Sequence, residues 1–171
     1  MKLVPLCLTF ALLSPFAATA ADMDITVEVP RLNVAEYHRP YVAIWIERPD
    51  NSVAANLSVW YDVDMKDNEG TKWLKDMRQW WRRTGRTLSM PVDGVSGATR
   101  PVGQHQLNFK GADAPLAGLA PGQYTLQVEA SREVGGREVV SIPFTWPATA
   151  ASQKQAQGNS ELGVVKLALK P

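Results

Sequence analysis

The sequence predicts an all-β protein, an antiparallel immunoglobulin-like β-sandwich with one inserted amphipathic helix. Short runs in which apolar and polar residues alternate occur along most of the chain, and a period of two is typical of strands with one buried face. Turn-forming pairs separate these runs, as at Pro121-Gly122 and Gly135-Gly136. With 171 residues, 45% of them apolar, the chain can bury a core without a metal or a disulfide.

Seven alternating runs are the expected strands. They span residues 25–29, 42–46, 57–63, 107–109, 124–128, 140–144 and 165–169. Seven short strands with such turns are typical of a sandwich. Trp45 and Trp60 fall on the side of their strands opposite the aliphatic residues, where an exposed ring would mark a contact surface. Residues 148–158, rich in Ala, Ser and Gln, are expected to form a loop.

Residues 71–83 break the alternation and predict a helix that lies across an edge or a face of the sandwich. The apolar residues that share one face of this helix are Trp73, Leu74, Met77, Trp80 and Trp81. The basic side chains between them point away, and Gly85 is a suitable stop. Core packing is the better interpretation for Trp73 and Trp81. For Trp80 two interpretations stay open, namely core packing and contact with a ligand.

Residues 1–20 have the features of a cleaved secretory signal peptide. Lys2 precedes a mostly apolar stretch, and Ala18-Thr19-Ala20 provides the small residues that a signal peptidase reads. Cleavage leaves residues 21–171 as a single exported domain and removes Cys7, the one cysteine, which excludes thiol chemistry and disulfides. Without Lys2, 17 of the 18 Lys and Arg remain against 17 Asp and Glu. This balanced charge disfavours nonspecific nucleic-acid binding.

The sequence contains no recognisable catalytic or metal-ligating constellation. His38 and His105 are far apart and form no His-x-His or His-x-x-x-His pair, which disfavours a metal site. The acids of residues 62–69 loosely resemble a calcium loop, but the central Gly is missing, and a solvated strand end explains them better. An independent hydrolase would need a nucleophile beside a base. We therefore expect no catalytic residue and no metal.

The segment Asp93–Pro101 predicts an exposed, sharply turning loop, because it combines an acid, two glycines and two hydroxyls. Ser96 and Thr99 have no His or Lys close in sequence to accept a proton, so neither can easily act as a catalytic nucleophile on its own. Such a hydroxyl can instead enter the active site of another enzyme. The alternative interpretation is a Gly-rich turn that joins two strands.

In this loop the pattern Asp-x-x-Ser-Gly-Ala-Thr resembles the sequence recognised by the periplasmic FAD:protein FMN transferase. That enzyme joins FMN to a threonine hydroxyl through a phosphodiester. The resemblance implies that Thr99 is the acceptor, that Ser96, Gly97 and Ala98 fit the transferase, and that Asp93 is needed for recognition. The implied cofactor is covalent FMN, and the implied compartment is the periplasm.

Most of residues 22–170 resembles a family of uncharacterised predicted periplasmic proteins, often encoded beside FAD:protein FMN transferases and PepSY-domain membrane proteins. The matching pieces are residues 41–47, 73–83, 92–101 and 124–146. With a covalent flavin, such a protein would relay electrons between a membrane redox protein of the PepSY type and a periplasmic acceptor. The alternative is a non-catalytic accessory module that docks on a membrane redox protein through its Trp-rich helix.

If FMN is bound to Thr99, nearby side chains are expected to hold it. The cations expected to pair with its phosphodiester are Arg100, Arg82, Arg83 and Arg86. The rings expected to stack on its isoalloxazine are Trp80, Trp81 and Trp60.

Overall fold

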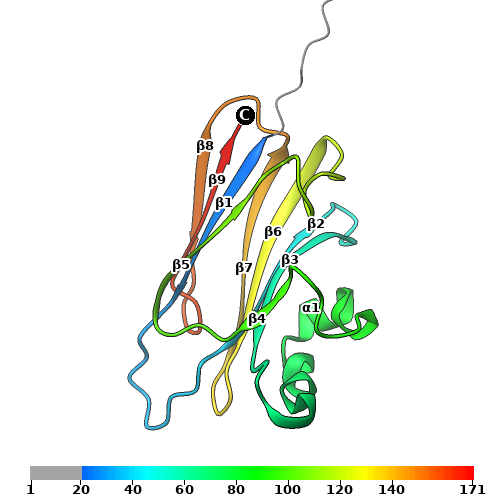
Figure 1. The fold of residues 1–171 in the computed structure, drawn as a ribbon. Coiled ribbons are helices and arrows are strands. Elements are labelled where there is room, and N and C mark those ends of the chain that lie inside the picture. The colour runs from blue at the N-terminus through cyan, green and yellow to red at the C-terminus, as the bar shows by residue number, and fades with distance from the viewer. Residues whose placement is uncertain (1–20) are drawn as a thin grey trace, which may run out of the picture.

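Two β-sheets pack face to face, and a short helical segment covers the outer side of one of them (Figure 1). The computed structural model describes residues 21–171, so the expected signal peptide at residues 1–20 lies outside the described residues. The first sheet has the strand order β5 (Gly103–Phe109), β1 (Asp22–Val29), β9 (Val164–Lys170) and β8 (Ser152–Gln157). The second sheet has the order β4 (Ser96–Ala98), β3 (Val53–Tyr61), β2 (Tyr41–Glu47), β6 (Gly122–Ser131) and β7 (Arg137–Trp146).

This arrangement confirms a mostly β, two-sheet protein and corrects two details. The neighbouring strands are antiparallel except β3 and β4, which run parallel over three residues, so the second sheet is mixed. β8 forms where a loop was expected, because its backbone pairs with β9 while its side chains stay mostly exposed. An edge strand of this kind needs no apolar alternation, and its sequence therefore carries no strand signal. The immunoglobulin-like topology stays a prediction.

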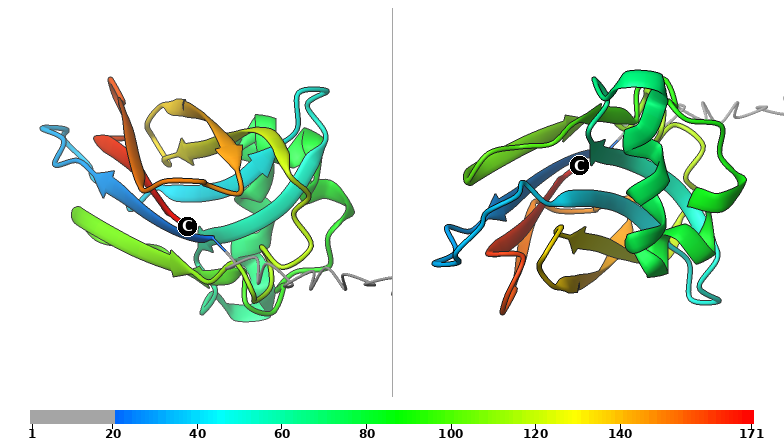
Figure 2. Two further views of the ribbon diagram at one scale, coloured as in Figure 1. Left: turned by 90° about the horizontal axis from the view of Figure 1, so that it is seen from above. Right: turned by 90° about the horizontal axis from the view of Figure 1, so that it is seen from below.

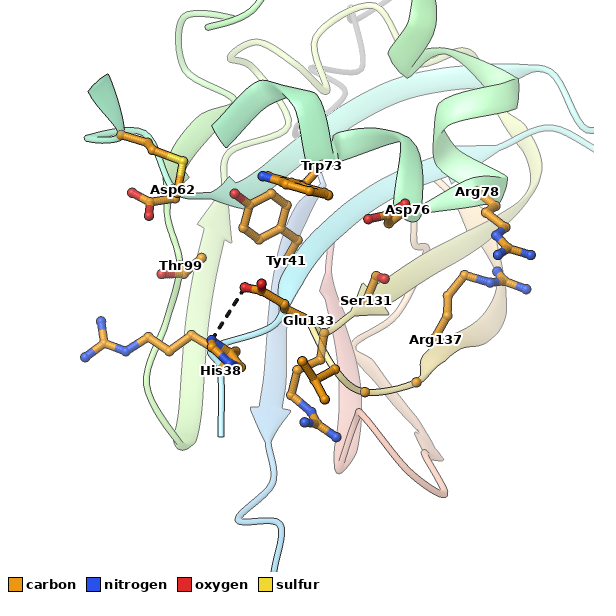
Figure 3. Close-up of a pocket in the computed structure, with 16 residues that line it drawn as sticks. His38, Tyr41, Asp62, Trp73, Asp76, Arg78, Thr99, Ser131, Glu133 and Arg137 are labelled. Carbon is orange, nitrogen blue, oxygen red and sulfur yellow. Dashed lines mark ion pairs between the residues drawn. The ribbon is translucent and has the colours of Figure 1, made fainter. Parts of the chain in front are cut away.

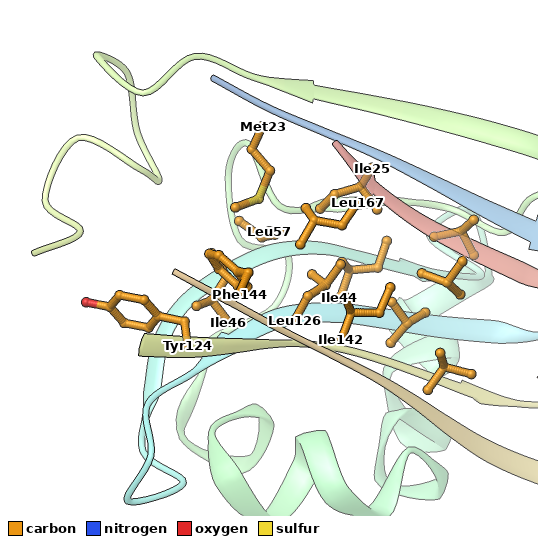
Figure 4. Packing of buried hydrophobic residues seen from close by; sticks show 14 of the residues in the cluster. Met23, Ile25, Ile44, Ile46, Leu57, Tyr124, Leu126, Ile142, Phe144 and Leu167 are labelled. Atoms are coloured by element: carbon orange, nitrogen blue, oxygen red, sulfur yellow. The ribbon is translucent and has the colours of Figure 1, made fainter. Parts of the chain in front are cut away.

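The main core lies between the two sheets (Figures 2 and 4). On β1 the buried residues alternate with partly exposed ones and are Met23, Ile25, Val27 and Val29. Aliphatic side chains of β2, β6 and β7 meet them from the second sheet, among them Ile44, Leu126 and Ile142. The period-two pattern is confirmed for β1, and burial of these side chains supplies the main driving force for folding.

Trp45 and Trp60 are both buried, so neither ring provides the exposed contact surface that was considered for them. Trp45 does point away from the main core, but the helical segment covers that side of β2 and forms a second core with it. Trp60 belongs to the main core, because a β-bulge leaves Leu57 out of the pairing with β2 and shifts the alternation of β3 by one residue.

The helix expected at residues 71–83 is divided into shorter pieces. A 3₁₀ helix, η1, spans Lys66–Asp76, the α-helix α1 spans Arg78–Arg83, and a 3₁₀ turn, η2, spans Gly85–Thr87. The division falls at Met77, whose ψ of 73° is not helical. The apolar face of a continuous α-helix is therefore not preserved along the segment.

This division changes which aromatic residues of the segment are buried. Leu74, Met77 and Trp80 pack on the second sheet and are fully buried, whereas Trp73 is turned to solvent with 51% of its surface exposed. Trp81 is half-buried against the same cluster. The assignment of Trp73 to the core is therefore wrong, and Trp80 takes its place there.

A buried carboxylate anchors α1 to the second sheet. Glu129 on β6 is fully buried and accepts hydrogen bonds from the backbone nitrogens of Gln79 (3.0 Å) and Trp80 (2.7 Å). It also accepts one from Nη1 of Arg137, at 2.7 Å. The first turn of a helix leaves such N–H groups without partners inside the helix, so Glu129 caps α1 from a distant strand.

Candidate functional site

The motif segment lies at the edge of the second sheet, where β4 pairs with the end of β3. The backbone nitrogen of Val59 donates to the carbonyl of Val95 at 2.8 Å, and the backbone nitrogen of Thr99 donates to the carbonyl of Tyr61 at 3.1 Å. These bonds hold the motif in an extended conformation along one strand edge. Thr99 therefore has a fixed position at the end of a strand.

The residues before Thr99 form a tight turn. Oγ of Ser96 accepts a hydrogen bond from the backbone nitrogen of Val92 at 2.8 Å, and the backbone nitrogen of Ser96 donates to the carbonyl of Val92 at 2.9 Å. Gly94 has a φ of 69°, in the left-handed region that favours glycine. Asp93 is exposed on this turn. The serine of the motif therefore has a structural role in closing the turn.

Trp60 fixes the other side of the motif. A Cβ added at Gly97 would lie 3.9 Å from Cδ1 of Trp60, and the guanidinium carbon of Arg100 lies 5.5 Å from the centroid of the indole. The ring of His105 meets the same indole edge-on, with centroids 5.7 Å apart. Arg100 is thus an exposed side chain beside Thr99 that packs on Trp60.

Thr99 is half-buried and lines a cavity of about 710 Å³. Figure 3 shows Thr99 and Asp62 on one side of this cavity, Arg78 and Arg137 on the opposite side, and Tyr41 with Trp73 along the wall between them. The volume falls within the range of about 300–1,000 Å³ that is usual for small-molecule sites. Several parts of the fold contribute, namely the β1–β2 loop with the start of β2, the connection from β3 to η1, η1 with the start of α1, the segment after β4, and the β6–β7 hairpin.

Apolar side chains gather around this cavity. Among residues 21–171, five large hydrophobic side chains are exposed, and three of them line the cavity: Met65, Trp73 and Val134. Tyr41 adds a second aromatic ring, and burial raises the pKa of its hydroxyl, which stays a hydrogen-bond donor at neutral pH. Exposed apolar surface beside a concave site is typical of contact sites.

The charged side chains of the cavity differ in how far they are already paired. Arg137 is bonded to Glu129, and the buried guanidinium of Arg132 pairs with Glu161 through a 2.8 Å contact. Among residues 21–171, Arg39 and Arg78 make no ion pair, and both are exposed. These two cations are therefore available to an anionic ligand.

The negative charges and the histidine of the cavity do not form a metal site. Asp62, Asp76 and Glu133 line the cavity, and Glu133 lies 3.5 Å from Nδ1 of His38. In the part of the chain that the structure describes, no three His, Cys, Asp or Glu side chains lie close enough together to hold a metal ion.

The structure corrects two predictions of ligand-holding residues. Trp80 is fully buried and does not line the cavity, so it cannot stack on a ligand there. Arg82 and Arg83 also lie elsewhere, since Nε of Arg82 donates to the carbonyl of Arg78 and Arg83 lies 3.5 Å from buried Glu47. Arg86 is likewise not part of the lining.

Sequence reasoning missed the residues that do face Thr99. Tyr41 precedes the expected strand at residues 42–46, Trp73 is predicted in the core, Gly135 is predicted only as part of a turn, and Val134 has no predicted role. Their approach to Thr99 depends on the pairing of β2 with β3 and β6, in which Tyr41 pairs with Ser131 from a distant part of the sequence. No local pattern contains that information.

The fold and the site define a mostly β protein of two packed sheets whose motif threonine lines a surface cavity. The chain belongs to the family DUF2271, described as "Predicted periplasmic protein", whose model matches residues 22–164. This confirms the predicted family and the periplasmic location. Searches of the curated proteins and of the solved structures found no match. No helix within residues 21–171 is long and apolar enough to cross a bilayer.

Proposed function

We propose that the protein carries FMN covalently on Thr99 and relays electrons between a membrane redox protein and a periplasmic acceptor. The observation that carries this proposal is the position of Thr99, half-buried in the wall of a cavity large enough for a small-molecule ligand.

The chemistry of attachment needs only an accessible hydroxyl on this chain. In the transfer, Oγ1 of Thr99 bonds to the FMN phosphorus of FAD, the pyrophosphate bond breaks, AMP leaves, and the hydroxyl loses its proton. The FAD:protein FMN transferase supplies the catalytic groups. β4 is the outermost strand of its sheet, and Asp93 and Ala98 are exposed, so the motif is accessible to such an enzyme.

The side chains near Thr99 fit a flavin phosphodiester. Arg100 adjoins the acceptor, and Arg39 lies in the cavity lining without an ion pair among the described residues, so either can meet the remaining negative charge. When bound, the flavin would supply the redox chemistry, and the protein would control its exposure and its partners. The expected partners are the transferase and a membrane redox protein of the PepSY type.

Periplasmic co-expression with an active transferase tests this proposal. Purified protein should be yellow, and its intact mass should exceed that of the bare chain by one FMN less one water. Thr99→Ala should remove both colour and added mass, whereas Thr145→Ala, at an exposed threonine on β7, should keep them. A colourless wild-type protein, or an adduct that survives Thr99→Ala, overturns the proposal.

The second candidate function is a non-catalytic module that docks on a membrane redox protein. The exposed apolar side chains Met65, Trp73 and Val134 favour it, because such surface is typical of contact sites. A protein that stays unmodified beside an active transferase but binds a membrane redox partner through Trp73 would support this function.

A further inference from the structure

We propose that the cavity beside Thr99 is a preformed bed for the isoalloxazine ring, with Trp73 and Tyr41 as its aromatic wall and Arg78 as the cation at its far side. The inference deepens the proposed function and rests on it, because the ring arrives there as part of the flavin bound to Thr99. In this arrangement the phosphodiester stays at the Thr99 side and the ribityl chain crosses the cavity.

The exposure of Trp73 is the first observation that supports the bed. The neighbouring apolar residues of the helical segment, Leu74, Met77 and Trp80, are fully buried, while Trp73 keeps 51% of its surface in solvent. Its indole faces the cavity together with the ring of Tyr41 (Figure 3). Flat aromatic surfaces stack favourably on another flat ring, and a flavin would cover the apolar area that is now exposed to water.

The position of Trp73 relative to Thr99 is fixed by backbone packing. A Cβ on Gly70 would collide with the carbonyl oxygen of Asp62, so η1 rests directly on the end of β3. Leu74 buries the opposite side of η1 against the sheet. Because Tyr61, next to Asp62, accepts the backbone hydrogen bond of Thr99, the aromatic wall and the attachment point share one rigid support.

The β6–β7 hairpin forms the facing rim. Val134 at its tip has a φ of 51°, a conformation that β-branched residues rarely adopt, and 76% of its surface is exposed. The conformation is enforced by the turn around it, where the backbone nitrogen of Gly135 donates to the carbonyl of Arg132 at 3.0 Å. Strain of this kind is found at ligand clamps, and here it presents an apolar side chain to the cavity.

Arg78 contributes a positive charge to the far side of the cavity. It lies across the cavity from Thr99 (Figure 3), where the ring and not the phosphate would reach. Among the described residues it makes no ion pair. A cation near the pyrimidine part of a flavin stabilises the negative charge that the ring gains on reduction. Arg78→Gln should therefore lower the reduction potential of the bound flavin.

The fluorescence of the bound flavin tests the bed, because an indole stacked on isoalloxazine quenches its emission. Loaded wild-type protein should emit weakly, and Trp73→Ala should brighten the flavin several-fold, with Trp73→Phe between them. Lys72→Ala is the matched control, since Lys72 is exposed on the same helix but does not line the cavity. Equal loading is checked by intact mass, and folding by circular dichroism.

The outcomes separate this inference from the proposed function. Loaded protein whose flavin is as bright as free FMN in wild type and all variants overturns the bed but leaves covalent attachment intact. If Thr99 stays unmodified, the proposed function fails. Dilute free FMN, titrated with the protein up to millimolar concentration, then tests the cavity, because that concentration is comparable to the effective concentration of a tethered ligand. Saturable quenching lost in Trp73→Ala supports the bed, and its absence in wild type overturns it.

Discussion

Replacing Glu129 by Gln should destabilise the protein, because no orientation of a glutamine satisfies the donors that meet there. Oε1 of Glu129 accepts from the backbone nitrogen of Gln79 and from Arg137, and Oε2 accepts from the backbone nitrogen of Trp80. A glutamine offers one acceptor oxygen and an NH₂ group that only donates. Either way round, this NH₂ faces at least one N–H donor in a fully buried site.

The magnitude follows from counting these contacts. Loss of a hydrogen bond to a charged group costs about 1.5–3 kcal/mol, and an unsatisfied buried donor costs about 1–3 kcal/mol. Since the helical segment can relax away from the sheet, we expect a net loss of about 3 kcal/mol in the free energy of unfolding. In a domain of this size that lowers the midpoint of thermal unfolding by about 6–12 °C.

Thermal and urea unfolding, followed by circular dichroism, measure this loss. Glu133→Gln is the control, because Glu133 belongs to the same hairpin, its side chain is 73% exposed, and it lies 3.5 Å from His38. That variant should stay within about 0.5 kcal/mol of wild type. If Glu129→Gln and Glu133→Gln prove equally stable, Glu129 does not anchor α1 and the reasoning is refuted.

Two further predictions concern packing and pH. A Cβ at Gly85 would lie 2.5 Å from Cζ3 of Trp80, so Gly85→Ala should cost about 1–3 kcal/mol in urea unfolding, while Gly118→Ala, with open space around it, should not. Burial alone would raise the pKa of Glu138, but hydrogen bonds from the backbone nitrogens of residues 159–162 lower it. Because its pKa is lowered, the ionised Glu138 carboxylate stabilises the fold at pH values above the ordinary carboxyl range, and this stabilisation is lost in acid. The loss of unfolding free energy in Glu138→Gln should therefore become smaller as the pH falls below about 4. A deficit that does not change with pH would contradict this.

The strands that were predicted correctly are those whose burial alternates locally. On β1 every second residue is buried, and the alternation can be read directly from the sequence. On β3 the same reasoning fails at the bulge that skips Leu57, because a bulge depends on the partner strand and leaves no local mark. Trp60 therefore faces the main core, while Val59 and Tyr61 face the helical segment on the other side of the sheet.

The helical segment shows why the lining of the cavity could not be predicted. An α-helical period places Trp73 and Leu74 on one apolar face, which is how residues 71–83 were interpreted. The segment is instead 3₁₀ up to Asp76, and it is held to the sheet by side chains such as Glu129 that are distant in sequence. Thr99 is a candidate because its segment resembles the sequence recognised by the FMN transferase. The side chains around it can be identified only from the folded structure.

The placement of Trp73 and Thr99 in the cavity wall depends on contacts with the second sheet. Gly70 places η1 against the end of β3, Glu129 holds α1 on β6, and the parallel pairing of β4 places Thr99 beside Tyr61. These three contacts are made with different strands of the same sheet. The position of Trp73 relative to Thr99 is therefore set by how these strands pair. Sites built on strands and helices hold their geometry more closely than sites built on loops. A flavin on Thr99 would therefore meet its aromatic wall without a conformational change, and weakening any one of these contacts should brighten its fluorescence even where Trp73 itself is intact.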